Sequence, residues 1–390
     1  MPWKEVSVMG ERQEFVRLAL AEGANRRELC RRFGISADVG YKWLARWQAG
    51  DRELADRSRR PHVSPLQSSA AVETEVLAVR DAHPAWGARK IARVLEDRGQ
   101  HAPAPSTVHA ILKRHERIMP PVGGAPATQR FEKEAPNQLW QMDFKGWVRL
   151  GDGTPCHPLT MVDDHSRFVP CLAACANQQG VTVRGHLERT FRRYGLPDAL
   201  FVDNGAPWGE ASGERWTRLG VWLLKLGVGL LHSRPYHPQS RGKNERFHRT
   251  LKAEIFDFAR FSDLAAVQRA FDAWRELYNF ERPHAALDLD VPARRYRPSS
   301  RPMPEHLPEV IYDEGEVVRT VPSTKAYVSF KGRKWKVPKA FCGERIAIRP
   351  LDTDGRYGIF FAALRIAAID LTTKQSVSDL SEQVSAISPG

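Results

Sequence analysis

Residues 235–252 read PYHPQSRGKNERFHRTLK and carry the most information about this chain. The stretch begins as a proline- and glycine-rich loop and continues as a basic amphipathic helix. At about 100° per residue, one sector of this helix collects Phe247, Leu251, Ile255 and Phe258. This sector predicts an apolar stripe that packs into a core.

The acidic residue of this stretch, Glu245, lies on the other side of the predicted helix. Three basic residues, Arg241, Arg249 and Lys252, fall within about 40° of it, at spacings that share a helix face. A carboxylate surrounded by cationic groups suggests phosphate chemistry, in which the carboxylate binds a metal and the cations bind a nucleic-acid backbone. A solvated helix face with ordinary salt bridges is the alternative interpretation.

Two further carboxylates have unusual contexts. Asp143 lies inside a strand-like apolar run, where an acid is costly unless it is paired. Asp203 ends the apolar run 199–202 and is followed by the turn signal Asn204-Gly205. The end of a strand before a turn is where α/β sheets place ligand sites. Asp143, Asp203 and Glu245 are therefore the predicted catalytic residues.

Three carboxylates from two strands and a helix are suitable ligands for Mg²⁺ or Mn²⁺. Two such ions can hold the attacking and leaving oxygens of a phosphoryl displacement. The sequence separations are 60 residues from Asp143 to Asp203 and 42 from Asp203 to Glu245. Glu210 and Glu214 are the nearest competitors for the second position, but no strand-like run precedes them.

With these residues in place, the chain resembles the DDE-type insertion-sequence transposases that share the retroviral-integrase core. The resemblance spans at least residues 10–300. It rests on Trp140-x-x-Asp143, the run 162–167 (VDDHSR), Asp203-Asn204-Gly205, the loop and helix 235–248, and Tyr278-Asn279-x-x-Arg282-Pro283-His284. The spacing between the second acid and the glutamate is longer than in many relatives. The surplus falls in the glycine-rich segment 205–213, where insertions are tolerated.

The resemblance implies a DNA transposase, a polynucleotidyl transferase that recognises terminal inverted repeats, cleaves the 3′ ends and transfers them into target DNA. It implies double-stranded DNA as partner, two Mg²⁺ or Mn²⁺ ions, a homo-oligomer that joins two ends, and no covalent enzyme intermediate. The zinc module that opens many retroviral-type integrases is absent, so we expect no zinc. Two alternatives stay open: a metal-dependent nuclease of the same fold that never joins strands, and a non-catalytic DNA-binding regulator derived from a transposase.

The amino-terminal part predicts helical DNA-binding modules. Residues 1–50 read as a helix-turn-helix domain, with a glycine turn at Gly34 and a second helix capped by Ser36. Residues 51–69 form a basic linker, and residues 70–118 form a second helix-turn-helix-like domain. A plain three-helix bundle and a solvated tether are the respective alternatives. The predicted DNA contacts are Tyr41, Lys42 and Arg46 in the first domain, Arg57, Arg59 and Arg60 in the linker, and Arg241, Lys243, Arg246, Arg249 and Lys252 around Glu245.

The remaining sequence completes a multidomain α/β chain. After a Pro- and Gly-rich linker over 119–137, residues 138–300 predict a ribonuclease-H-like integrase core, with strands over 139–149, 157–164, 167–174, 198–203 and 228–232. Residues 313–371 predict a small β-barrel with a basic hairpin around Trp335, which is either a DNA contact or a solvent face. Residues 372–390 predict a disordered tail.

The composition agrees with a polyanionic partner. Lysines and arginines number 59 against 46 acidic residues, which gives a net charge of +13 spread over the whole chain. No apolar run predicts a membrane span and no signal peptide opens the chain. The five cysteines form no Cys-x-x-Cys pair and predict a reducing compartment. We therefore expect a protein of the bacterial cytosol that associates with the nucleoid.

Overall fold

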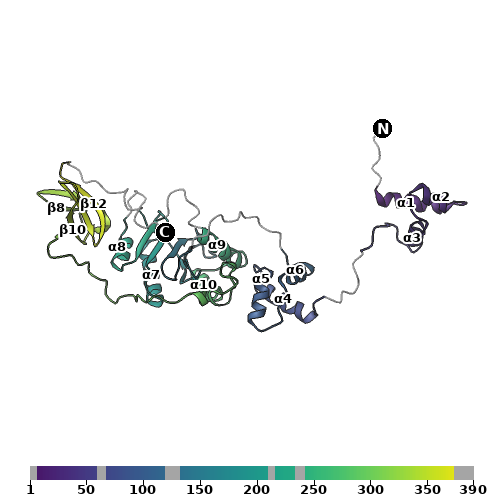
Figure 1. The fold of residues 1–390 in the computed structure, drawn as a ribbon, viewed down its shortest axis with the longest axis horizontal. Helices are drawn as coiled ribbons and strands as arrows, with labels where there is room; N and C mark the ends of the chain where they lie inside the picture. Colours follow the sequence, from purple (N-terminus) through teal and green to yellow (C-terminus); the bar gives the residue numbers. More distant parts are fainter. Residues whose placement is uncertain (1–6, 59–66, 119–131, 210–215, 233–241, 373–390) are drawn as a thin grey trace. The chain divides into compact units, whose positions relative to one another are not determined.

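The computed structural model describes residues 7–58, 67–118, 132–209, 216–232 and 242–372 (Figure 1). The chain separates into two compact units, Met1–Ser68 and Ser69–Gly390. Over the described ranges, no helix is both long enough and apolar enough to cross a membrane.

The first unit is the predicted helix-turn-helix bundle. Its helices are α1 (Val8–Ala19), α2 (Arg26–Arg32) and α3 (Ala37–Gln48). The side chains of Ser7, Asn25 and Ser36 accept hydrogen bonds from backbone N–H groups in the first turns of these helices. Gly34 has a φ of +63°, which lets the chain turn tightly between α2 and α3.

The face of α3 that packs into the bundle includes Gly40 and not its neighbour Val39. The apolar residues of the second predicted helix suggest that Val39 packs inward and Gly40 is exposed, but Val39 is 38% exposed and Gly40 is buried. A Cβ atom at Gly40 would lie 2.5 Å from Cys30 Sγ, so close helix packing requires glycine there. Residues 51–56, expected to begin the linker, pack on the bundle through the fully buried Leu54.

The second unit begins with another three-helix group. It comprises α4 (Ala70–Ala82), α5 (Ala88–Asp97) and α6 (Pro105–Arg114). One apolar core joins the three helices and includes Trp86, whose ring stacks on His83 at 3.8 Å between centroids. In the sequence, the segments from Trp86 and from Ser106 both suggest the start of a helix, and α5 and α6 begin within two residues of these positions.

A mixed sheet forms the centre of the second unit. Its strands are β1 (Trp140–Phe144), β2 (Val148–Arg149), β3 (Pro155–Asp163), β4 (Cys171–Cys175), β5 (Ala199–Val202) and β6 (Gly229–His232). The expected strand 139–149 is interrupted between β1 and β2, where Gly146 has a φ of +76°. β3 pairs antiparallel with β1 and β4, while β1, β5 and β6 are parallel. The order β4-β3-β1-β5-β6 is that of a ribonuclease-H-like fold.

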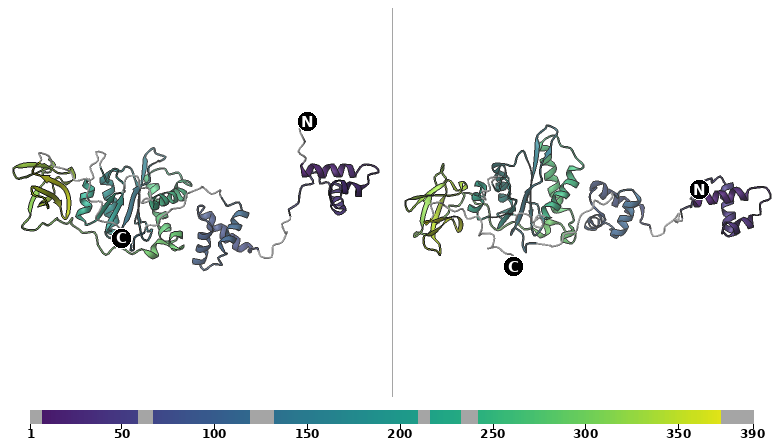
Figure 2. Two further views of the ribbon diagram at one scale, coloured as in Figure 1. Left: turned by 45° about the horizontal axis from the view of Figure 1, so that its top comes forward. Right: turned by 90° about the horizontal axis from the view of Figure 1, so that it is seen from above.

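Helices cover both faces of this sheet (Figure 2). On one face, α7 (Gly180–Tyr194) and α8 (Arg218–Lys225) bury Trp140, Met142 and Leu200. On the other, α9 (Gly242–Leu251) and α10 (Leu264–Phe280) pack on Val162 and Leu172. Two short helices, Ala285–Leu287 and α11 (Pro292–Arg295), follow.

The apolar stripe of α9 is confirmed for three of its four residues. Phe247, Leu251 and Ile255 are buried, but Phe258 is 56% exposed and Phe256 is buried in its place. A π-helical turn, η2 (Lys252–Phe256), follows α9 directly. Because a π turn holds more residues than an α turn, the 100° periodicity fails after Lys252. The prediction for Phe258 was wrong for this reason.

This corrected register gives a stability test. Leu251→Ala is expected to lower the free energy of unfolding by about 2–5 kcal/mol, because it empties a fully buried site. Phe258→Ala removes a larger side chain but should cost less than about 1 kcal/mol, since Phe258 is mostly exposed. Urea titration of the full-length variants makes the comparison, and equal losses would contradict the π-helical register.

The carboxyl-terminal strands do not form the expected closed barrel. β7 (Val317–Thr320), β10 (Arg345–Pro350), β11 (Arg356–Phe361) and β12 (Leu364–Asp370) form an open antiparallel sheet in the order β12-β11-β10-β7. β8 (Tyr327–Phe330) and β9 (Arg333–Lys336) form a separate hairpin. The two sheets share one core around Trp335 and Phe341. The pair Lys331-Gly332 suggests a hairpin turn in the sequence, and the structure has the turn there, with φ values of +47° and +73°.

Candidate active site

The alternation of β1 decides which way Asp143 faces. Trp140 and Met142 are buried against α7 and α8. Side chains alternate along a strand, so Gln141 and Asp143 project to the opposite face, on which α9 packs. Asp143 lies at the carboxyl end of the strand and is partly exposed, and its Oδ1 accepts a hydrogen bond of 2.8 Å from the N–H of Phe144.

The parallel pairing of β1 with β5 brings Asp203 beside Asp143. Trp140 pairs with Leu200, and Gln141 pairs with Phe201. Continuing this register by two residues sets Asp143 opposite Asp203. Leu200 and Val202 face α7 and α8, so Asp203 is on the same face of the sheet as Asp143. A hydrogen bond of 3.2 Å from Gly205 N–H to Asp203 Oδ1 orders the turn after β5.

Glu245 reaches the same region on α9. It lies on the exposed side of the helix, while Phe247 and Leu251 are buried beneath it. One turn further along, His248 Nε2 is 2.9 Å from the hydroxyl of Thr160, which donates at 2.9 Å to the backbone carbonyl of Asp143. Thr160 is also the residue that pairs with Asp143 across β3 and β1. These two hydrogen bonds therefore hold α9 beside the end of β1.

The protonation of His248 follows from its surroundings. Burial, together with the nearby positive charge of Lys145, lowers the pKa of His248 to about 4, so the ring is neutral at pH 7. Thr160 has one hydroxyl proton and gives it to the Asp143 carbonyl. Nε2 of His248 is therefore the protonated nitrogen and donates to Thr160.

The side chains of Asp143, Asp203 and Glu245 do not converge on one position at which all three could bind a metal ion. In the parts of the chain that the structure describes, no group of three or more His, Cys, Asp or Glu side chains could hold a metal ion. Asp143 and Asp203 occupy neighbouring positions, and Glu245 lies on the adjoining helix. The loop 235–241 before α9 and the competitors Glu210 and Glu214 lie outside the described residues. The donor set itself, three carboxylates, fits Mg²⁺ or Mn²⁺.

The predicted DNA contacts near Glu245 divide into two groups. Arg246, Arg249 and Lys252 are exposed, although the Lys252 ammonium also binds Asp257. Lys243 instead points into the protein, where its Nζ lies 2.6 Å from Oδ1 of the fully buried Asp164. Burial lowers the pKa of Lys243, and the opposing effect of Asp164 is smaller. Arg241 lies outside the described residues.

The predicted DNA contacts of the first unit also divide into exposed side chains and one that binds within the protein. Tyr41 is 46% exposed, and the Lys42 ammonium lies 4.9 Å from the centroid of the Trp43 ring. Arg46 is largely buried, and it donates at 2.9 Å to Asp51 and at 2.7 Å to the carbonyl of Ala55. These bonds make Arg46 part of the scaffold of the bundle. Arg57 is 73% exposed, whereas Arg59 and Arg60 lie outside the described residues.

Sequence reasoning missed one cation of the site region. Lys145 follows Asp143 by two residues, and its ammonium lies 5.4 Å from the centroid of the Phe256 ring. Burial lowers the pKa of Lys145, and the positive charge of nearby Lys252 lowers it further. The carboxylate of Asp257, which pairs with Lys252, acts on Lys145 in the opposite direction. The signal of Lys145 in the sequence was only a lysine after a strand.

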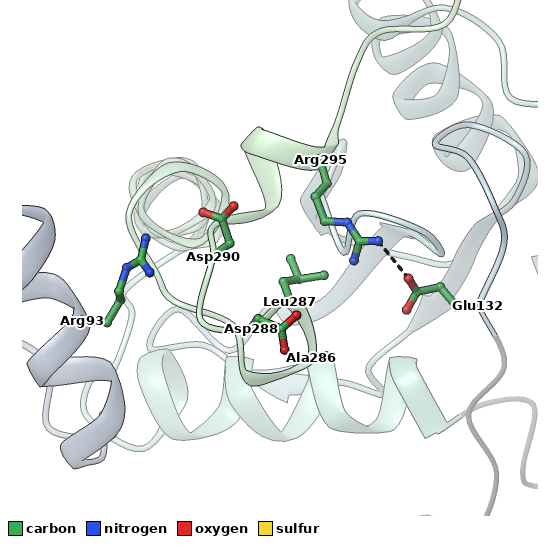
Figure 3. A pocket seen from close by; sticks show the side chains of 7 residues that line it. All are labelled: Arg93, Glu132, Ala286, Leu287, Asp288, Asp290 and Arg295. Atoms are coloured by element: carbon green, nitrogen blue, oxygen red, sulfur yellow. Dashed lines mark hydrogen bonds and ion pairs between the residues drawn. The ribbon is translucent and has the colours of Figure 1, made fainter.

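A separate cavity of about 440 Å³ lies beside the segment 286–290 (Figure 3). Arg93 and Arg295 line it together with Glu132, Asp288 and Asp290. Arg295 is ion-paired with Glu132 at 3.3 Å. None of the three predicted catalytic carboxylates lines this cavity, so it is not the candidate active site.

Comparison with protein families matches five segments of the chain. Integrase core domain models match residues 133–238 and 226–292. The model of the IS481 family transposase C-terminal domain matches residues 316–377. A helix-turn-helix domain model matches residues 11–62, and a homeodomain-like model matches residues 39–112. The matches therefore cover the DNA-binding, core and carboxyl-terminal regions in turn.

Curated relatives come from insertion elements and retroviruses. The insertion element IS407 uncharacterized 31.7 kDa protein of Burkholderia multivorans is 28% identical over 57% of this chain and 80% of its own length. The IS476 uncharacterized 39.2 kDa protein of Xanthomonas euvesicatoria is 23% identical over 59% of this chain and 66% of its own. The Gag-Pol polyprotein of baboon endogenous virus is 27% identical over 47% of this chain, which spans only 11% of that polyprotein.

Solved structures of retroviral integrases are also similar. The simian T-cell lymphotropic virus intasome, in complex with a PP2A regulatory subunit, matches 74% of this chain and 97% of its own at 18% identity, with a TM-score of 0.37. The HTLV-2 integrase catalytic core with magnesium matches 42% of this chain and 99% of its own at 14% identity, with a TM-score of 0.32. The integrase core models, the transposase C-terminal model and the insertion-element relatives together support a DDE-type transposase with a retroviral-integrase-like core.

Proposed function

We propose that this protein binds the terminal inverted repeats of a mobile element, cleaves their 3′ ends and joins them to target DNA. One observation carries the proposal. The register of β1 and β5 sets Asp143 and Asp203 side by side, on the face of the sheet that α9 covers. Glu245 lies on the exposed side of α9. Its place of action would be the bacterial cytosol, on the nucleoid.

The carboxylates of Asp143, Asp203 and Glu245 would hold two divalent ions. When bound, Mg²⁺ or Mn²⁺ supplies activation of water and charge stabilisation at the attacking and leaving oxygens. In the first step, water attacks a phosphodiester: a P–O bond to the water oxygen forms, the P–O bond to the 3′ oxygen breaks, and that oxygen takes up a proton and leaves as a 3′-hydroxyl. In the second, that hydroxyl attacks a target phosphodiester, forming one P–O bond as another breaks. No side chain needs to form a covalent intermediate.

A reconstituted reaction tests this proposal. Purified protein is mixed with end DNA of its element, Mg²⁺ and a supercoiled target plasmid, with EDTA in the control. We expect nicked ends and joined products that depend on the metal. Nicking without joined products would favour the nuclease alternative, and binding without nicking would favour the regulator. Joining two ends to one target also requires a multimer, which light scattering of the DNA complex can measure.

Arg249 and Lys252 are expected to hold the DNA backbone near the carboxylates. Arg249→Glu or Lys252→Glu places a negative charge where a phosphate should pass, so strand transfer should fall strongly. Neutral substitution of either residue should reduce the slope of log affinity against log salt by about 1. Arg192→Glu, the same change on an exposed residue of α7, is the matched control. Equal losses in all three charge-reversed variants would argue against a specific DNA track on α9.

End recognition is expected to reside in the amino-terminal modules. A fragment covering residues 1–118 should bind end DNA specifically without the core, and its affinity should fall steeply with salt. The exposed Tyr41 and Lys42 at the start of α3 are the proposed base contacts. Footprinting of this fragment on end and unrelated DNA measures the preference, and equal protection of both would move recognition elsewhere in the chain.

A further inference from the structure

Asp164 is a buried carboxylate that touches both elements of the candidate site. It follows β3 and has no exposed surface. Its Oδ1 accepts hydrogen bonds from Gln141 Nε2 at 2.7 Å and from Lys243 Nζ at 2.6 Å. Its Oδ2 accepts from the N–H of Lys133 at 2.8 Å. One carboxylate thus binds a side chain of β1 and a side chain of α9.

Both of these partners stand two residues before a predicted metal ligand. Gln141 precedes Asp143 on the same face of β1, because side chains alternate along a strand. Lys243 precedes Glu245 in the first turn of α9, and about 200° of helical rotation separates them. Lys243 therefore points inward to Asp164 while Glu245 points outward. Asp164 therefore links, through Gln141 and Lys243, the two elements that carry Asp143 and Glu245.

We propose that Asp164 is a positioning residue that sets the distance between Asp143 and Glu245, with Lys243 as its link to α9. The inference rests on the proposed function and assigns Lys243 an internal task in place of a contact with DNA. Its physical basis is that a buried carboxylate needs partners, so the chain cannot shift α9 away without leaving a charge unpaired. Groups that orient metal ligands in this way change metal affinity or activity about 10–100-fold when they are removed.

The test uses the full-length protein and two conservative changes, Asp164→Asn and Lys243→Met. Each removes a charge and keeps the side chain near its original size. Mn²⁺ affinity is measured by calorimetry, DNA affinity is measured in EDTA, and strand transfer is measured over a range of Mg²⁺ concentrations. Lys225→Met is the matched control, because the Lys225 ammonium is 2.9 Å from Glu344 and its side chain is shielded to a similar degree.

We expect both variants to bind Mn²⁺ about 10–100-fold more weakly and to recover part of their strand transfer at high Mg²⁺. Their DNA affinity should equal that of the wild type, and Lys225→Met should keep wild-type metal affinity. The double variant should lose no more metal affinity than either single variant, since both changes break one link. Lys243→Arg, which keeps the charge, should restore most of the affinity.

Two results would overturn the proposal. One is unchanged Mn²⁺ affinity in Lys243→Met. The other is a loss of DNA affinity in Lys243→Met with a smaller salt dependence, which would make Lys243 a phosphate contact. If Asp164→Asn does not fold, the Mn²⁺ affinity and the DNA affinity of Lys243→Met decide the proposal alone. If the wild type binds Mn²⁺ but neither cuts nor joins DNA, the proposed function fails, while the Mn²⁺ affinities still decide the role of Asp164.

Discussion

Asp143→Asn, Asp203→Asn and Glu245→Gln are each expected to abolish cleavage and strand transfer while sparing folding and binding of end DNA. Each change removes the charge of a proposed metal ligand and keeps the size of the side chain. Metal-assisted charge stabilisation contributes several kcal/mol to such reactions, so we expect rates to fall by at least about 10³-fold. Joining of labelled end DNA to a plasmid in Mg²⁺ measures the loss, and gel-shift assays in EDTA measure end binding.

The controls for this prediction make the same chemical changes elsewhere in the core. Asp272→Asn and Glu188→Gln alter acids on α10 and α7 that accept hydrogen bonds from Gln268 and Arg184. Both should keep near-normal strand transfer. Should Asp203→Asn also keep it, Asp203 is not a metal ligand, and Glu210 and Glu214 become the candidates to test in its place.

Arg282→Met is expected to lower the free energy of unfolding by about 3–5 kcal/mol, because it leaves Glu254 as an unpaired buried charge. The Arg282 and Glu254 side chains are each 8% exposed, and Arg282 Nη2 lies 2.8 Å from Glu254 Oε1. Glu254 also accepts 3.0 Å from Trp274 Nε1. Glu254 therefore ties η2, at the end of α9, to α10 through Trp274 and to the segment just after α10 through Arg282. Urea unfolding followed by tryptophan fluorescence measures the change.

A surface pair provides the comparison for Arg282. Arg184 and Glu188 form an ion pair of 2.8 Å on α7, with side chains 50% and 30% exposed. Arg184→Met should cost about 0–1 kcal/mol. The double change of Arg282 and Glu254 to Met should destabilise less than Arg282→Met alone, since no buried charge is left. A double variant that is less stable than the single one would show that the pair itself, and not the orphaned carboxylate, carries the stability.

Local patterns in the sequence were sufficient for the elements and for the choice of candidate residues. The cap at Ser36 and the turn at Gly34 predicted the helix-turn-helix of the first bundle, because these signals act within a few residues. The helical periodicity correctly buried Phe247 and Leu251 and exposed Glu245. The strand before the turn at Asn204 correctly placed Asp203 at the end of β5.

Contacts between distant segments could not be predicted in this way. No local pattern indicates that Lys243 binds Asp164, 79 residues away, or that Arg46 donates hydrogen bonds to Asp51 and Ala55. A cationic side chain looks the same in sequence whether it meets a phosphate or a buried carboxylate. Which of these it meets depends on what the fold brings opposite to it.

The sequence by itself determined the modules of this protein, the three acids and the inner and outer faces of α9, because periodicity, caps and turns are local properties of the chain. Only the tertiary structure decided that Asp143 and Asp203 are neighbours, because that follows from the register of β1 with β5. It also decided that Phe256 replaces Phe258 in the core and that the carboxyl-terminal sheet stays open. These outcomes depend on packing and strand pairing between segments far apart in the chain, where many arrangements satisfy the same local pattern.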